Sequence, residues 1–91
     1  MPHSVSAKKR VRQNLRRRAR NRTIQSRIRT AQRAMRRALE ARDLDGARQS
    51  FRSCERLLRR AATNGPLHRN TASRLVSRLR RRLNALERTA G

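Results

Sequence analysis

Nine basic side chains crowd into fifteen residues near the start of the sequence, and together they could neutralise a line of phosphates. An arginine guanidinium presents a planar fork of N–H donors that suits bidentate contact with phosphate. Each such contact also releases condensed counterions, which makes the affinity depend on salt. No acid precedes Glu40, so no carboxylate opposes a polyanion here. The expected backbone contacts are Lys8, Lys9, Arg10, Arg12, Arg16, Arg17, Arg18, Arg20 and Arg22.

The residue types that usually catalyse reactions or bind metal ions form no constellation in this sequence. Cys54 is the only cysteine, and neither His3 nor His68 stands at a spacing that would make a catalytic pair or a zinc site with it. The five acids lie at expected helix ends or among arginines. Interaction with the helix dipole and ion pairing with arginine account for them there. We therefore predict a protein that is not an enzyme, has no cofactor, no metal ion and no small-molecule substrate.

Three stretches carry apolar residues at the three- and four-residue steps of an amphipathic helix. They cover about residues 6–42, 44–63 and 67–88. Helices joined by short links bury such stripes against one another, which predicts an all-α fold, an antiparallel three-helix bundle in one domain over residues 1–91. The expected core residues are Ile24, Ile28, Ala31, Met35 and Ala38, then Leu44, Ala47, Phe51, Cys54, Leu58 and Ala61, then Ala72, Leu75, Val76, Leu79, Leu83 and Leu86.

The expected helix ends follow from residues with special backbone or capping properties. Ser6 and Asp43 are suitable N-caps for the first two helices. The second helix should end at Gly65, which suits a left-handed position and precedes a proline. Asn70 is a candidate N-cap for the third helix, although a start nearer residue 66 is open. His68 lies in this link, where it could cap a helix end, contact phosphate or simply form part of the turn.

The first predicted helix is longer than a small bundle requires. About 36 residues would span roughly 54 Å, so we expect its C-terminal half to pack and its basic N-terminal half to project into the partner. Upstream of Ile24, only Val11, Leu15 and Ala19 are assigned to the packing face. Few apolar contacts and strong repulsion predict that this half frays in the free protein and is helical when bound.

The overall charge restricts the partner to a polyanion. The sequence has 27 Lys and Arg against 5 Asp and Glu, a formal net charge of +22, and only 1% aromatic residues. Without aromatic platforms for stacking bases, we expect recognition of backbone shape and charge. No run approaches the roughly 18–20 apolar residues of a membrane span, and no secretory signal is visible, so we expect no membrane partner. A nucleoid-type DNA-compacting protein is the alternative function, although no dimerisation device or intercalating wedge is visible, and we expect no homo-oligomer.

Two blocks of the sequence are similar to a known family. The first is Ser6-Ala7-Lys8-Lys9-Arg10-Val11-Arg12-Gln13-Asn14, followed by Arg16-Arg17-Arg18-Ala19-Arg20-Asn21. The second is Gly65-Pro66-Leu67-His68-Arg69-Asn70-Thr71-Ala72-Ser73-Arg74-Leu75. Both resemble the family of bacterial small-subunit ribosomal protein number twenty, and the resemblance covers essentially the whole chain.

The resemblance implies a structural protein of the cytoplasmic ribosome. It implies a three-helix bundle whose long first helix inserts among helices of the small-subunit ribosomal RNA, and a primary binder that acts early in assembly. Alongside the basic run, hydrogen bonds to RNA are expected from Ser6, Gln13, Asn14 and Asn21. A second contact set is expected at His68, Arg69, Asn70, Arg74 and Arg78.

Overall fold

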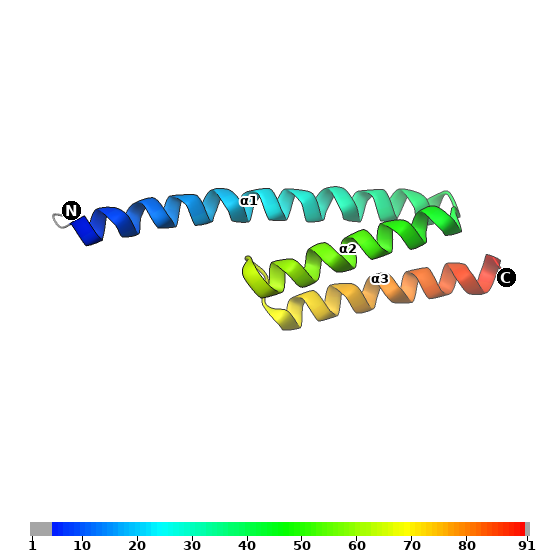
Figure 1. Cartoon of the computed structure of the whole chain (residues 1–91). Coiled ribbons are helices and arrows are strands. Elements are labelled where there is room, and N and C mark those ends of the chain that lie inside the picture. The colour runs from blue at the N-terminus through cyan, green and yellow to red at the C-terminus, as the bar shows by residue number, and fades with distance from the viewer. Residues whose placement is uncertain (1–4, 91) are drawn as a thin grey trace.

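The computed structural model describes residues 5–90, with side chains to residue 89, as three α-helices. They are α1 (Val5–Glu40), α2 (Leu44–Asn64) and α3 (Arg69–Ala90). The helices run antiparallel in succession, and α2 packs closely on both neighbours, whereas α1 and α3 approach each other much less closely (Figure 1). The molecule is a rod of 65 × 21 × 15 Å. The predicted all-α three-helix bundle is confirmed.

The core forms where the three predicted apolar stripes meet, and every expected core residue is buried or half-buried. One cluster joins all three helices around Met35, Phe51 and Leu83. An adjoining cluster joins Ile28 of α1 and Leu58 of α2 to the start of α3. The interpretation of Cys54 as a core residue is confirmed, because its side chain is buried and its free thiol has its pKa raised by desolvation.

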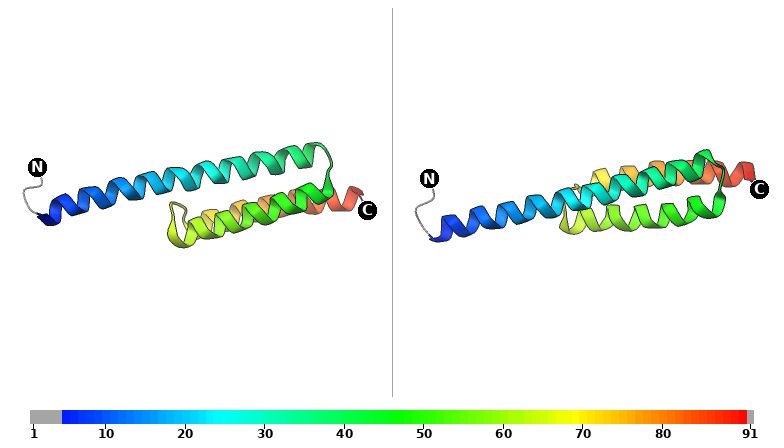
Figure 2. Two further views of the ribbon diagram at one scale, coloured as in Figure 1. Left: turned by 45° about the horizontal axis from the view of Figure 1, so that its top comes forward. Right: turned by 90° about the horizontal axis from the view of Figure 1, so that it is seen from above.

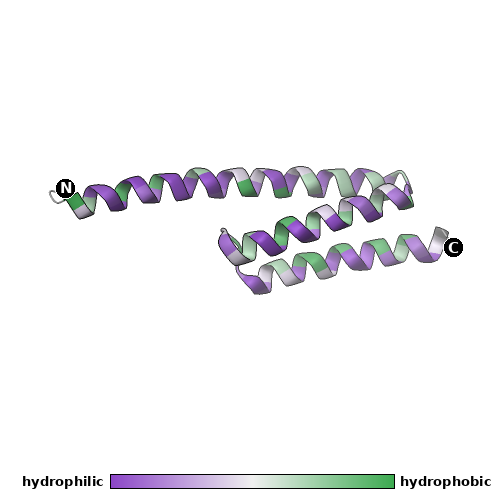
Figure 3. Ribbon diagram, viewed as in Figure 1, coloured by the Kyte–Doolittle hydropathy of each residue, from purple (hydrophilic) through white to green (hydrophobic). Residues whose placement is uncertain are grey.

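The N-terminal half of α1 extends past the rest of the bundle (Figures 1 and 2). Between residues 5 and 23, every side chain is exposed except those of Ala7 and Asn21, which are half-buried. Arginine and lysine are good helix formers, and the segment contains neither proline nor glycine. Hydrophilic residues dominate this half, interrupted by a few apolar positions (Figure 3). Helix α1 therefore extends beyond the hydrophobic core toward the N-terminus.

The apolar residues of the projecting half do not lie on the packing face, so that prediction was wrong. Leu15 precedes Ile24 by nine residues, which is about two and a half turns at 3.6 residues per turn. Leu15 and Val11 accordingly face away from the bundle and remain 60% and 47% exposed. The error arose because five residues separate Ala19 from Ile24, a step of about 140° around the helix, which places the upstream apolar residues on the opposite side.

The ends of α1 differ from the expectation. The helix includes Val5, so Ser6 lies within the first turn and is not the N-cap. At the other end, the N–H of Asp43 donates to the carbonyl of Ala38 at 2.9 Å, and the N–H of Arg42 donates to that of Leu39 at 3.2 Å. This is the hydrogen-bond pattern of a Schellman motif, in which glycine usually takes the left-handed position. Here Arg42 takes it, with φ 56°.

Asp43 also begins α2, as predicted. Its backbone is extended, and its Oδ1 accepts from the N–H of Gly46 at 3.1 Å. A Cβ at Gly46 would overlap this carboxylate, so a larger residue there would require the Asp43 side chain to shift. Asp45 lies in the same turn, near the positive end of the helix dipole.

The link between α2 and α3 corrects two further expectations. Gly65 is extended, with φ −131° and ψ −156°, and is not left-handed. Glycine suits this position because the space for a side chain is small. A Cβ there would lie 3.0 Å from the carbonyl oxygen of Ala61 and 3.3 Å from Cδ1 of Ile24. The first turn of α3 is capped by His68, whose Nδ1 accepts from the N–H of Asn70 at 3.1 Å. Asn70 is therefore not the N-cap, and His68 takes the capping role, which was one of the roles predicted for it.

Candidate nucleic-acid interface

The predicted basic run lies entirely on the projecting half of α1. All nine of its Lys and Arg side chains are exposed, as are Ser6, Gln13 and Asn14, while Asn21 is half-buried where the bundle begins. Successive residues are about 100° apart around a helix, so these cations surround the axis on every side. A single helix of this kind can contact phosphates on more than one side at once.

The acidic residues lie far from this half of α1. Glu40, Asp43 and Asp45 cluster at the connection between α1 and α2, at the opposite end of the rod. Glu87 of α3 lies at the same end and accepts from Nε of Arg48 across 3.3 Å. Asp45 also pairs with Arg48, and Glu55 of α2 pairs with Arg59, so the ion pairs among residues 5–89 lie within the bundle and none involves the projecting half. Arginines still outnumber the five acids in the rest of the chain, so the whole rod is positive, and its charge is unopposed by carboxylates along the projecting half.

The second predicted contact set begins near the projecting half of α1, and its later members lie further along α3, away from that half. Arg69 and Asn70 are exposed in the first turn of α3. The link that precedes them is held against α1, because Nη2 of Arg20 donates to the carbonyl oxygen of Asn64 across 3.4 Å. Arg74 and Arg78 are also exposed, but they lie further along α3, and Arg78 lines a shallow groove between α1 and α3.

His68 has one ring nitrogen committed to the cap of α3. Its Nδ1 accepts a backbone N–H, which leaves Nε2 as the nitrogen that a ligand could reach, and the residue as a whole is exposed. His3 lies outside the described residues.

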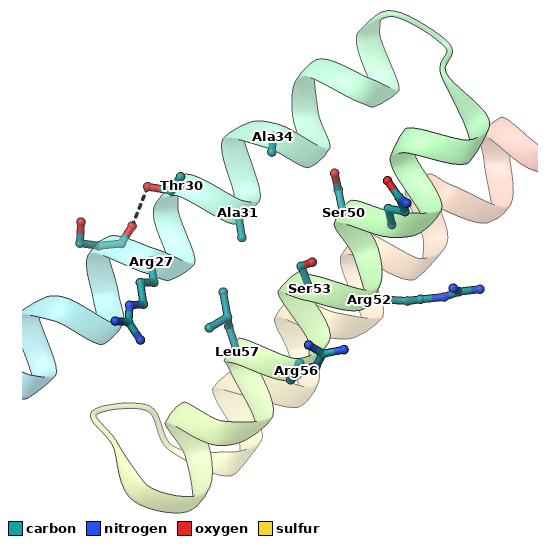
Figure 4. A pocket seen from close by; sticks show the side chains of 11 residues that line it. Arg27, Thr30, Ala31, Ala34, Ser50, Arg52, Ser53, Arg56 and Leu57 are labelled. Atoms are coloured by element: carbon teal, nitrogen blue, oxygen red, sulfur yellow. Dashed lines mark hydrogen bonds between the residues drawn. The ribbon is translucent and has the colours of Figure 1, made fainter.

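Sequence reasoning missed a basic groove between α1 and α2 (Figure 4). Small side chains form its walls, including Ala31, Ser50 and Ser53, and arginines stand along its edges. Guanidinium groups and serine hydroxyls can both donate to phosphate oxygens. The signal was present in the sequence as small residues beside the core stripes, with arginines one turn away. The arginines of the groove are Arg27, Arg52 and Arg56.

The described residues contain no arrangement suited to catalysis or metal binding. No group of three His, Cys, Asp or Glu side chains within residues 5–89 could hold a metal ion. Cys54 is only 1% exposed, and the raised pKa of its thiol keeps it protonated. No helix in this part of the chain has the length and apolar character needed to cross a membrane.

Comparison with known proteins gives one consistent family. The family described as ribosomal protein S20 matches residues 2–84. The small ribosomal subunit protein bS20 of Dinoroseobacter shibae is 46% identical over 86 residues, which are 94% of this chain and 98% of the relative. The proteins of the same name from Rhodopirellula baltica and Geobacter metallireducens are 44% and 42% identical, covering 87% and 94% of this chain and 88% and 99% of their own lengths. With a match over nearly its whole length, the chain belongs to the ribosomal protein S20 family.

Proposed function

We propose that the protein is a structural component of the small ribosomal subunit in the cytoplasm, where it binds ribosomal RNA directly and performs no catalysis. The observation that carries this proposal is the projecting half of α1, which is rich in Arg and Lys, free of acids and outside the core, in a chain of the S20 family. The curated relatives are named as proteins of the small ribosomal subunit, which supports the same place of action.

Phosphate neutralisation is the proposed mechanism. RNA helices that pack closely repel one another through their backbones, and a cationic rod between them lowers that repulsion. The projecting half supplies nine charges over residues 8–22, and each phosphate contact adds to the entropy of counterion release. The bundle fixes the direction of the rod, because α1 runs without a break from the core into the basic segment.

Binding to RNA and to DNA separates this proposal from that of a general nucleic-acid compactor. The full chain is titrated against small-subunit ribosomal RNA and against duplex DNA with the same number of phosphates, at matched ionic strength. We expect the RNA to bind at least about tenfold more tightly, a difference of 1.4 kcal/mol. Equal affinity, together with condensation of the DNA, would instead favour a nucleoid-type protein. Incorporation of the chain into reconstituted small subunits is the corresponding test of its place of action.

A further inference from the structure

The projecting half of α1 has two chemically different faces. Ser6, Arg10, Gln13 and Arg17 precede Ile24 by 18, 14, 11 and 7 residues, which are close to whole numbers of helical turns. These side chains therefore continue the direction in which the core stripe faces, and we call them the inner face. The outer face lies half a turn away and carries the exposed apolar residues around Leu15.

The inner face overhangs the link between α2 and α3. The core stripe of α1 faces α2 and α3 along the bundle, but the two shorter helices end at the link, and α1 continues past it (Figures 1 and 2). Beyond the link, the same direction opens onto solvent. The inner face of α1 and the end of the bundle thus form a step. The projecting helix is one wall of the step, and the link between α2 and α3 is the other.

The corner of the step is held by three contacts between residues far apart in the sequence. Arg20 of α1 donates to the carbonyl of Asn64, the last residue of α2, across 3.4 Å. Gly65 lies so close to Ile24 that a Cβ would approach the Ile24 side chain to 3.3 Å. Leu67 packs into the same apolar cluster as Ile24. The two walls therefore meet at a defined place.

Arg20 also determines the electrostatics of the corner. The C-terminus of α2 carries the negative end of its helix dipole, and the guanidinium of Arg20 neutralises it. The side chains at the start of α3 tilt toward the N-terminus of that helix, which is toward the overhang. Both walls therefore offer donors and positive charge, and the described residues place no carboxylate beside the corner.

The inner face combines cations with neutral donors. Gln13, Arg16, Arg17 and Arg20 line a shallow concavity along it. Guanidinium groups suit phosphates, whereas an amide can donate to and accept from a ribose 2′-hydroxyl, the group that distinguishes RNA from DNA. The overhang from residue 5 to residue 20 is roughly 24 Å long, enough to reach phosphates on both sides of a groove.

We propose that the step binds a single RNA helix, which contacts the inner face of α1 and the start of α3 at the same time, while the outer face of α1 contacts a different RNA segment. This inference rests on the proposed function and deepens it. It assigns part of the basic run of α1 and part of the contact set on α3 to one RNA helix. Arg17 and Arg69 belong to that shared site. Arg18, which lies toward the outer face, does not.

Tethered cleavage of RNA tests the assignment. Single cysteines are introduced as Gln13→Cys on the inner face, Thr71→Cys at the exposed start of α3 and Leu15→Cys on the outer face, and each is labelled with an iron chelate that generates hydroxyl radicals. Cys54 is 1% exposed, so the unsubstituted chain treated with the same reagent is the matched control. Each labelled protein is bound to small-subunit ribosomal RNA at saturating concentration, and the cleaved nucleotides are mapped.

We expect the probes at positions 13 and 71 to cleave overlapping nucleotides of one RNA helix, and the probe at position 15 to cleave a separate segment. Saturable binding with cleavage of two different helices from positions 13 and 71 would overturn the shared site but leave the proposed function standing. Overlapping cleavage from all three positions would overturn the division into two faces. Absence of saturable RNA binding by the unsubstituted chain would instead overturn the proposed function itself.

Discussion

The guanidinium carbon of Arg80 lies 4.7 Å from the centroid of the Phe51 ring, so a cation from α3 covers the largest side chain of the core. The ring itself is only 3% exposed, and its cluster includes Met35 of α1 and Leu83 of α3. Phe51 is therefore the residue at which all three helices meet. The guanidinium covers one face of the ring and adds about 0.5–1 kcal/mol of cation–π attraction.

Replacement of this ring should abolish cooperative unfolding of the isolated protein. Truncating a buried phenylalanine to alanine costs roughly 3–5 kcal/mol, which is comparable to the whole stability of a small and highly charged domain. We expect Phe51→Ala to lose its cooperative thermal transition, followed by circular dichroism, and to regain part of it when RNA is added. Phe51→Leu is the control, since it keeps most of the volume and should still melt cooperatively. An unchanged transition in Phe51→Ala would contradict the central place given to the ring.

The projecting half of α1 should be much less stable than the rest of the helix. Like charges four residues apart, such as Arg12 with Arg16 and Arg16 with Arg20, each oppose helix formation by about 0.2–0.5 kcal/mol. No core contact compensates for them before Ile24. Hydrogen exchange in the free protein should therefore be fast for amides 10–20 and slow for amides 28–38, and RNA should protect the first group. Strong protection of amides 10–20 at low salt without RNA would refute this prediction.

Relief of the left-handed backbone at Arg42 should stabilise the fold. A side chain at φ 56° costs roughly 1–2 kcal/mol, and glycine avoids this cost but loses more entropy on folding. We expect Arg42→Gly to raise the free energy of unfolding by about 0.5–1 kcal/mol in urea titrations, after comparison with Arg42→Gln, which removes the charge alone. Arg42→Val should lower it, because a β-branched residue fits this region worst. A lower stability for the glycine variant than for Arg42→Gln would show that the turn is not strained.

Removal of charge from the projecting half should change the salt dependence of RNA binding. Each phosphate contact contributes about 0.7–0.9 to the slope of log affinity against log salt. We therefore expect the joint replacement of four exposed arginines by glutamine to flatten this slope by about three units. Circular dichroism should show the bundle intact, because all four positions precede the core. The four substitutions are Arg16→Gln, Arg17→Gln, Arg18→Gln and Arg20→Gln.

A matched set on the bundle removes the same charge from other positions. Arg37, Arg60, Arg81 and Arg88 are exposed, and none takes part in the ion pairs found among residues 5–89. Their joint replacement by glutamine should change the slope clearly less. Equal flattening by both sets would mean that the protein binds as a diffuse polycation, without a special role for the projecting helix.

Local patterns in the sequence are enough to predict the elements and the core. The spacing of apolar residues from Leu44 to Ala61 admits only one inward face for a helix, and all six residues of that stripe are buried or half-buried. The cap at Asp43 is local too, since its carboxylate reaches a backbone N–H three residues away. The exposed basic run was also predictable, because so dense a positive charge cannot be buried without partners.

The helix ends and the shape of the interface depended on tertiary packing. Gly65 appeared suited to a left-handed turn, yet the chain must bring Leu67 into the cluster beneath Ile24, which draws the glycine into an extended conformation close to α1. The left-handed residue is Arg42 instead, where the turn into the Asp43 cap imposes it. The step between the inner face of α1 and the start of α3 is likewise absent from any local pattern. It arises because α2 and α3 end where α1 does not, and contacts separated by more than forty residues, such as Arg20 with Asn64, bring its two walls together.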